Sequence, residues 1–571
     1  MLYVKRSHFV LMQLPCRSFL LIALALVAGR CGSPRMSRLA NIGRRKYISV
    51  SGLADVLKDI RHNGMPSSIS RSSIKRARDQ EFDEYDTSYG TLIKQVTAGT
   101  DDDGNPCTFW FADPRACLHY MITQSPKLAA FFQEKLAANP CSINNPWSIV
   151  VYNDEITPGD QLQHHNARKT QAFYYSFLEF GAEALSSEFL WFTLSATRSD
   201  DVSEISGLSF GIFAKVQMMA FEAWSNIGFQ CGSIIIWAKV KLFVADESAI
   251  KFTLDVKGAS GNLPCFKCRN CLSKKTFAKT RPNSDLLSIT DIDYEAFLKH
   301  DDNSLKANAQ FLAEQKSVLK KIQFEKLQTS LGLNYNPDGI ILSGLDFMPI
   351  SGTCYDPQHV LLVNGVFNSE VGQLIVVLKS MKITISDMAS FFQSFNWPFQ
   401  SKSGNNLFDH RSNSSITDKE KKHPVLSCQA SDALGAFGLL QEFVMLRVFP
   451  KAQDAGKRVV AACASFFALC TVITMTTMIP RGGISPSKLM DAIIKHLKLH
   501  KEAYGESHWV PKFHYSLHLP EQLERWDLLI FASLMNVNTK KLSGICRGVR
   551  TLLPRGTKMC SRMFCTFKSW P

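Results

Sequence analysis

Two short metal-ligand motifs, far apart along the chain, most constrain how it can fold. Cys265 and Cys268 form a CxxC motif, and His514 and His518 form an HxxxH motif downstream. On a helix the second spacing places both imidazoles on one face, and two thiolates with two imidazoles make a closed tetrahedral Zn²⁺ site. Each motif alone is common, and Cys271 extends the first to CxxCxxC, which leaves an iron–sulfur cluster as an alternative without an evident fourth cysteine. We therefore predict a structural Zn²⁺ that ties the middle of the chain to a segment near its end.

Two acidic residues each follow a run of strand-forming residues. Asp154 ends the run SIVVYND, and Asp246 follows SIIIWAKVKLFVA. A turn cap at Asp154 and a helix N-cap at Asp246 are the ordinary explanations of such acids. Carboxylates at the ends of neighbouring strands are also the ligands that Mg²⁺ prefers alongside phosphate oxygens. Both residues are therefore candidate catalytic and magnesium-binding residues.

The positive charge of the chain is concentrated at its two ends. With 65 Lys+Arg against 50 Asp+Glu, the formal charge is +15 and the pI is about 9.1, which suggests an acidic partner such as nucleic acid or a membrane surface. Residues 1–50 hold nine basic residues and no acid, and residues 535–571 hold eight and no acid, which leaves 51–534 at −2. The hydrophobic content of 45% excludes a wholly disordered chain. A basic pI here does not indicate a basic globular body.

Two apolar stretches bear on localisation. Residues 19–28 follow three basic residues and resemble a secretory signal, with a gene-model extension as the alternative. Residues 459–479 carry no charge and are long enough to span a bilayer, but their Ser and Thr content favours a buried core helix. We expect no firm membrane association from either segment.

Several common catalytic motifs are absent from the sequence. It contains no P-loop, no GxGxxG after a strand and no HExxH, which removes the commonest nucleotide, dinucleotide and metalloprotease sites. The segment GLSFG matches the nucleophile elbow of hydrolases at Ser209, but polar residues precede it where a buried strand is required. A helix start or a loop is the expected structure there.

The order of the motifs resembles a known family. The stretches YNDEITPGDQL, VADESAIKFTLDVKGASGNLPCFKCRN, YDPQHVLLVNGVF and HWVPKFHYSLHLPEQLERW resemble the DDE-type transposases of CACTA-like (Enhancer/Suppressor-mutator-like) cut-and-paste elements, within the group that pairs CxxC with HxxxH. They span about residues 146–527. The resemblance implies an α/β fold with a ribonuclease-H-like catalytic core, interrupted by a large, mainly helical insertion and preceded by a helical N-terminal region.

The resemblance also assigns roles to residues. Asp154 and Asp246 would be the first two of three acids that bind Mg²⁺ or Mn²⁺ for DNA strand cleavage and transfer. The CxxC and HxxxH residues would be zinc ligands, and Asp356 and His359 of YDPQH would be accessory residues. The implied partner is the DNA of an element's terminal inverted repeats, with a nuclear location and a homo-oligomeric assembly. Secretion or membrane insertion is the alternative location if residues 19–28 are a genuine signal.

These expectations divide the chain into six regions. They are a basic leader (1–45), an N-terminal helical region (46–145), the first part of the core with the CxxC (146–280), a mainly helical insertion (281–505), the HxxxH segment (506–530) and an aberrant basic tail (531–571).

The third acid of the family, a Glu, is expected after the HxxxH segment in a stretch like CFxHERKHK. Residues 531–540 read FASLMNVNTK instead. We back-translated these residues into codons and regrouped the bases from the third base of the Phe531 codon. The shifted reading frame can then encode Cys-Phe-Thr-His-Glu-Arg-Lys-His-Lys. Its Glu codon is the same whichever synonymous codons are chosen. We hypothesise a frameshift near Ile530, with a divergent but genuine tail as the alternative.

The expected protein is an inactive transposase copy. A catalytically silent, transposon-derived DNA-binding or interaction protein is the main alternative, and a membrane or secreted protein is the lesser one.

Overall fold

The computed structural model describes residues 50–65, 70, 72, 86–156, 169–281, 285–395, 407–408, 424–479 and 483–526. The chain divides into two compact units, residues 1–78 and 79–571. The first contains the amphipathic helix α3 (Val50–Asn63). The leader predicted at 1–45 and the tail predicted at 531–571 lie outside the described residues.

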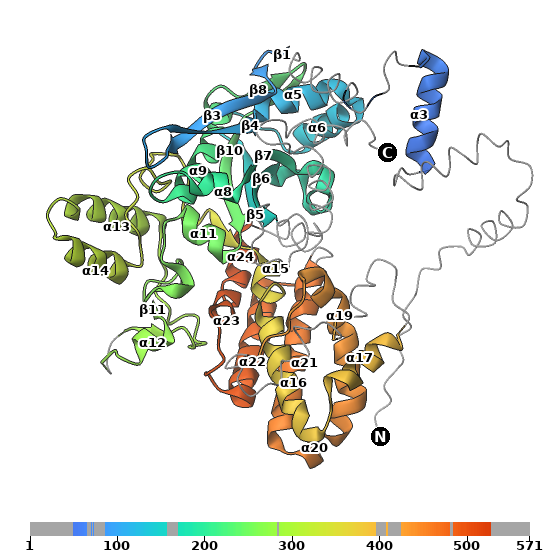
Figure 1. The fold of residues 1–571 in the computed structure, drawn as a ribbon, viewed down its shortest axis with the longest axis vertical. Coiled ribbons are helices and arrows are strands. Elements are labelled where there is room, and N and C mark those ends of the chain that lie inside the picture. Colours follow the sequence, from blue (N-terminus) through green and yellow to red (C-terminus); the bar gives the residue numbers. More distant parts are fainter. Residues whose placement is uncertain are drawn as a thin grey trace, which may run out of the picture. The chain divides into compact units, whose positions relative to one another are not determined.

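A five-stranded mixed sheet organises the second unit (Figure 1). Its order is β13-β10-β5-β6-β7. Strands β5 (Trp147–Ile156), β6 (Thr170–Phe177) and β7 (Phe192–Arg198) form an antiparallel meander, and β10 (Ala238–Ala245) and β13 (Thr353–Tyr355) run parallel to β5. Residues on both faces of β5 and β6 are almost all buried, which explains why these strands read as continuous apolar runs.

The region before the sheet differs from the predicted helical region 46–145. It contains the helices α5 (Pro114–Gln124) and α6 (Pro126–Ala138), but also the antiparallel hairpin β3 (Ile93–Thr100) and β4 (Pro106–Ala112). The acidic stretch DDDGN is the turn of this hairpin, where the Asp101 carboxylate accepts hydrogen bonds from the Asp103 and Asn105 amides. Most residues of β3 are exposed or only partly buried, so the alternation of apolar and polar residues that predicts a strand is weak here.

The segment between β10 and β13 crosses from one strand to the next through the cysteine loop and a helical hairpin. It contains α11 (Glu247–Thr253), β11 (Cys271–Leu272), β12 (Leu287–Ser288), α13 (Asp302–Gln315) and α14 (Lys321–Leu331). The three-residue strand β13 therefore lies within residues 281–505 and belongs to the central sheet. Within the described residues, the elements that follow β13 are all helices.

A helical bundle follows the sheet. Its main helices are α15 (Pro357–Leu361), α16 (Val366–Leu378), α17 (Ile385–Gln393), α19 (Ala430–Phe443), α21 (Lys457–Met478) and α22 (Pro486–Tyr504). Helix α21 covers the apolar stretch 459–479 and packs against α16 and α22. By length and composition alone, three helical stretches of the described chain are apolar enough to cross a membrane: Pro357–Met381, Ala430–Ala455 and Lys457–Met478.

Two short helices, α23 (Pro511–Ser516) and α24 (Leu519–Trp526), return from the bundle to the edge of the sheet. The remaining short elements are β1 (Asp86–Thr87), β2 (Gly90–Thr91), α7 (Ala182–Leu185), α8 (Ser199–Ser203), α9 (Ser209–Met219), α10 (Glu222–Asn226), β8 (Phe229–Cys231), β9 (Ile234–Ile236), α12 (Lys274–Phe277) and α20 (Ala452–Ala455).

Candidate functional site

The four predicted zinc ligands come together in the structure. Cys265, Cys268, His514 and His518 are all buried, and their ligand atoms lie within 4.8 Å of one another. His518 Nε2 lies 3.2 Å from Cys265 Sγ, 3.4 Å from Cys268 Sγ and 3.4 Å from His514 Nε2. Tetrahedral bonds of about 2.0 Å to nitrogen and 2.3 Å to sulfur place neighbouring ligand atoms about 3.3 to 3.8 Å apart. This Cys/His cluster can therefore hold a metal ion such as zinc.

The orientation of His518 is fixed by groups outside the cluster. Its Nδ1 lies 3.3 Å from the hydroxyl of Tyr294 and 3.8 Å from a carboxylate oxygen of Glu521, which also accepts a hydrogen bond from that hydroxyl. The hydrogen bond from His518 holds the pKa of Glu521 far below its usual range, although burial opposes the shift. Metal-binding histidines commonly have such partners, which set the ring orientation. This role of Glu521 was not predicted from the sequence.

The two thiols of the cluster ionise unequally. Burial alone would raise the pKa of Cys265, but a hydrogen bond from Cys268 and the nearby His518 and His514 lower it well below its usual value. The pKa of Cys268 is raised by burial and by the same hydrogen bond. A readily formed thiolate favours metal binding, because the metal ligand is the thiolate. Cys271 lies in β11 outside the group of four, which does not support the iron–sulfur alternative.

The predicted acids lie at the same end of three neighbouring strands. Val244 of β10 pairs with Tyr152 of β5, so Asp154 and Asp246 each come two residues after this pair. Strand β13 ends at Tyr355, and Asp356 follows it, with its amide bonded to the Ala245 carbonyl (3.0 Å). We call Asp154, Asp246 and Asp356 the carboxylate edge.

The three carboxylates differ in how they are engaged. Asp246 caps α11 by accepting a hydrogen bond from the Ala249 amide (2.6 Å). Asp356 is buried, accepts from the Gln358 amide (2.8 Å) and pairs with His359 Nδ1 (2.6 Å). Asp154 is partly exposed, and its carboxylate accepts no hydrogen bond from the described part of the chain. Asp154 is thus the carboxylate most open to a ligand.

The charges at this edge are not balanced. Burial raises the pKa of Asp154 to about 6, with further contributions from Asp246 and Asp356, while His359 opposes the shift. Burial alone would lower the pKa of His359, but the ion pair with Asp356 and the field of Asp154 raise it to about 9. His359 is therefore protonated at neutral pH and lies close to Asp154.

A second cation stands near the carboxylate edge. Lys512 of α23 donates to the Val363 carbonyl (2.6 Å), and Asp246, Glu247 and Asp356 oppose the lowering of its pKa that burial causes. Lys512 was not among the site residues predicted from the sequence. The available signal was its position two residues before the first histidine of HxxxH, which attaches it to the same helix as His514.

The Cys/His cluster and the carboxylate edge are joined through one residue, Tyr355. Its hydroxyl lies 3.7 Å from Cys265 Sγ, and its ring stacks on Tyr515 with 4.5 Å between centroids. The side-chain amide of Gln522 accepts from its backbone N–H (2.9 Å) and donates to its carbonyl (3.1 Å). Gln522 of helix α24 thereby provides hydrogen-bond partners for the backbone at the end of β13, directly before Asp356.

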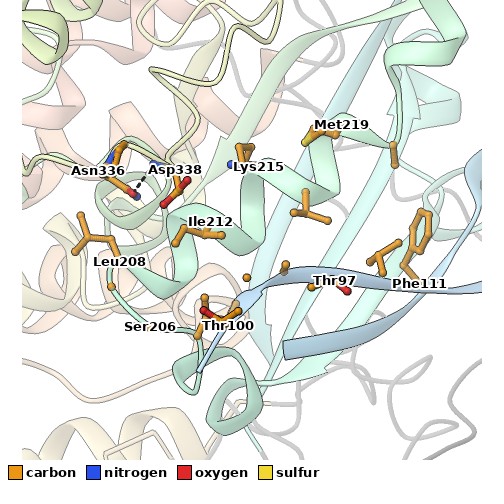
Figure 2. A pocket seen from close by; sticks show the side chains of 18 of the residues that line it. Thr97, Thr100, Phe111, Ser206, Leu208, Ile212, Lys215, Met219, Asn336 and Asp338 are labelled. Atoms are coloured by element: carbon orange, nitrogen blue, oxygen red, sulfur yellow. Dashed lines mark hydrogen bonds between the residues drawn. The ribbon is translucent and has the colours of Figure 1, made fainter. Parts of the chain in front are cut away.

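A cavity of about 1000 Å³ lies apart from both sites, between β3, α9 and residues 335–338 (Figure 2). Lys215 and Asp338 are its charged lining residues, and none of the predicted site residues lines it. Ser209 of GLSFG opens α9 after the helix α8, without a preceding strand, so the nucleophile-elbow geometry is absent.

The described chain thus contains a buried Cys₂His₂ cluster suited to a metal such as zinc, with an open carboxylate edge beside it. A scan against protein-family models and a search of the curated proteins both find no match for this sequence.

Proposed function

We propose that the chain is a transposase-like protein of a CACTA-like cut-and-paste DNA element. The observation that carries this proposal is the placement of Asp154 in β5 and of Asp246 directly after β10, each two residues beyond the paired Tyr152 and Val244. A Cys/His cluster beside them joins the strand region to the HxxxH segment. A nuclear location, homo-oligomeric assembly and terminal inverted repeats as the DNA partner form part of the same proposal.

The sheet topology supports a ribonuclease-H-like core. Three antiparallel strands (β5, β6 and β7) are followed by two strands (β10 and β13) that add in parallel on the other side of β5. The helical bundle separates β13 from the HxxxH helices along the chain, in keeping with an inserted domain.

The carboxylate edge suits a hard divalent cation. Asp154 is partly exposed, and its carboxylate accepts no hydrogen bond from the described chain. Its pKa is raised by partial burial and by neighbouring carboxylates, which a bound cation would counter. Mg²⁺ or Mn²⁺ bound there would stabilise attacking and leaving oxygens in phosphodiester displacement. His359, whose pKa is raised to about 9, and the neighbouring Lys512 would supply donors for orienting a phosphate near these acids.

We propose further that this copy is catalytically inactive. Residues 528–571 contain no acidic residue, so the third acid that the family requires has no candidate there. That segment lies outside the described residues. Asp356 does not replace the missing Glu, because both of its oxygens are engaged by Gln358 and His359. A catalytically silent DNA-binding protein is the second candidate function, favoured by the same missing acid.

Restoring the hypothesised reading frame tests the proposal. A chain carrying Cys-Phe-Thr-His-Glu-Arg-Lys-His-Lys from position 531 should cleave and join DNA that bears the element's terminal repeats, in a Mg²⁺- or Mn²⁺-dependent manner. The unmodified chain should bind this DNA without cleaving it. Asp154→Ala and Asp246→Ala in the restored chain should abolish cleavage, whereas Asp338→Ala at the cavity should not.

Two results would contradict the proposal. One is genomic DNA around codon 530 that lacks the alternative frame, which removes the frameshift hypothesis. The other is a restored chain that neither binds nor cleaves the repeats, which removes the transposase assignment.

A further inference from the structure

The helical hairpin α13–α14 is a separate arm of the second unit. In Figure 1 the two helices lie side by side, apart from the central sheet, and each packs mainly against the other. Leu305, Ala309 and Leu312 of α13 and Phe324 of α14 are its buried residues. The arm therefore has a small apolar core of its own.

The base of the arm is firmly attached. Asp301 and Ser304 form a capping box at the start of α13, and the Asp302 carboxylate accepts hydrogen bonds from the amides of Ile350 (2.7 Å) and Ser351 (3.0 Å). At the other end, Leu333 bridges to Val256. Both chain segments that connect the arm to the rest of the unit are thus held by hydrogen bonds, which support the tip.

The tip of the arm, residues 315–324, combines basic and apolar side chains. Val318 is 71% exposed and Ile322 is 68% exposed, which makes them among the most exposed large apolar residues of the described chain. Lys316, Lys320 and Lys321 are exposed around them, and no acid occurs between Glu314 and Glu325. Exposed apolar groups surrounded by one sign of charge mark an interaction surface rather than an ordinary solvated turn.

We propose that this tip is a contact arm for duplex DNA. The lysines match the charge of the phosphate backbone, and Val318 and Ile322 provide an apolar wedge of the kind that inserts between base steps. Residues 51–534 carry a net charge of only −2, so DNA contact by this body depends on local groups of basic side chains such as this one. This inference rests on the proposed function, since DNA is the anionic partner that it supplies.

Salt-dependent binding tests the charged part of the inference. The full-length, zinc-loaded protein is titrated against a labelled 30-base-pair duplex over a range of KCl concentrations. The triple variant Lys316→Gln/Lys320→Gln/Lys321→Gln should reduce the slope of log K against log[salt] by about 2 to 3 and weaken binding about tenfold or more at 0.1 M salt. A control triple, Lys127→Gln/Lys379→Gln/Lys498→Gln, removes equally exposed lysines from other helices and should change the slope less.

The apolar part has its own measurement. Val318→Ser/Ile322→Ser should leave the salt slope unchanged but reduce duplex bending, read from energy transfer between dyes at the two DNA ends. Equal losses of binding and salt slope in the tip and control triple variants would overturn the charged part of the inference. Unchanged duplex bending in the serine variant would overturn the apolar part. Loss of binding to phosphatidylserine vesicles with unchanged duplex binding would assign the tip to a membrane instead. No binding of the duplex by the unmodified protein would reject the proposed function itself.

Discussion

The Cys/His cluster and the carboxylate edge stand on either side of the Tyr355–Asp356 peptide, yet they are built in opposite ways. In the cluster, four buried groups converge within 4.8 Å, and Tyr294 and Glu521 orient one of them. At the edge, Asp154 lies near the end of β5, and Asp246 and Asp356 directly follow β10 and β13. The partly exposed Asp154 carboxylate accepts no hydrogen bond from the described chain. The first arrangement is closed and the second is open.

This difference corresponds to the physical distinction between structural and catalytic metal sites. A structural site uses all coordination positions for protein ligands, and metal binding there contributes directly to folding. An open site leaves positions for water and substrate, and its like charges destabilise the empty protein. We expect the cluster to determine stability and the edge to respond to added divalent ions.

Breaking the cluster should have the largest effect. Cys265→Ser removes one of four buried ligands and should lower the free energy of unfolding by more than about 5 kcal/mol, since structural zinc contributes about 10 kcal/mol or more in small domains. Cys271→Ser changes a buried neighbour outside the group of four and should keep full zinc content. Thermal denaturation and metal analysis of both variants measure this. Equal zinc contents in the two variants would contradict the ligand assignment.

Ligand chemistry explains why the cluster was predictable from sequence. Few residue types bind zinc, and the spacings CxxC and HxxxH each fix two of them locally, so the set emerges before any fold is known. Asp154 and Asp246 were recognisable because each follows an apolar run. Gln522, Tyr355 and Glu521 were not, because their contacts are set by tertiary packing between distant segments.

The prediction of secondary structure from the sequence was limited in the same way, by contacts between distant segments. Strands β5 and β10 were visible as apolar runs, whereas β6 and β7 were not predicted. Strand β13 has only three residues and lay within the stretch predicted to be a helical insertion. The β3–β4 hairpin was missed because the residues of β3 are mostly exposed or partly buried and show little apolar alternation. Short strands depend on their neighbours for stability, so their own sequence carries little signal.

The next largest effect should come from a buried histidine of the bundle, His500. Replacing it separates its own contribution to the pH dependence of stability from that of the cluster. Burial lowers the pKa of His500 to about 4. The unfolded chain takes up this proton near pH 6.5, so stability is lost as pH falls from about 6.5 to 4, by on the order of 3 kcal/mol. His500→Gln should reduce the loss of urea-derived stability over this window by about that amount, while the loss that accompanies zinc release on acidification should persist. An unchanged pH profile in the variant would disprove the assignment.

Loosening the link between the two sites should have a smaller effect. Gln522→Met removes two hydrogen bonds to the backbone of Tyr355 and should cost about 1 to 3 kcal/mol, because it leaves buried backbone groups unpaired. Hydrogen exchange at the amides of Tyr355 and Asp356 should accelerate, with zinc content unchanged. Gln453→Met, at an exposed position of α20, is the matched control. Equal exchange rates in the two variants would show that α24 does not hold β13.

The smallest effect should come from the carboxylate edge, and its sign distinguishes it from the cluster. Asp154→Asn removes one of three neighbouring negative charges and should stabilise the magnesium-free protein by about 1 kcal/mol. Added Mg²⁺ should raise the melting temperature of the unmodified protein but not that of the variant, because only the carboxylate gains from a bound cation. Asp491→Asn, an exposed acid on α22, should retain the full Mg²⁺ response. Equal stabilisation of all three proteins by Mg²⁺ would mean that the cation acts on general surface charge, and the edge would then be an arrangement of helix caps rather than an open metal site.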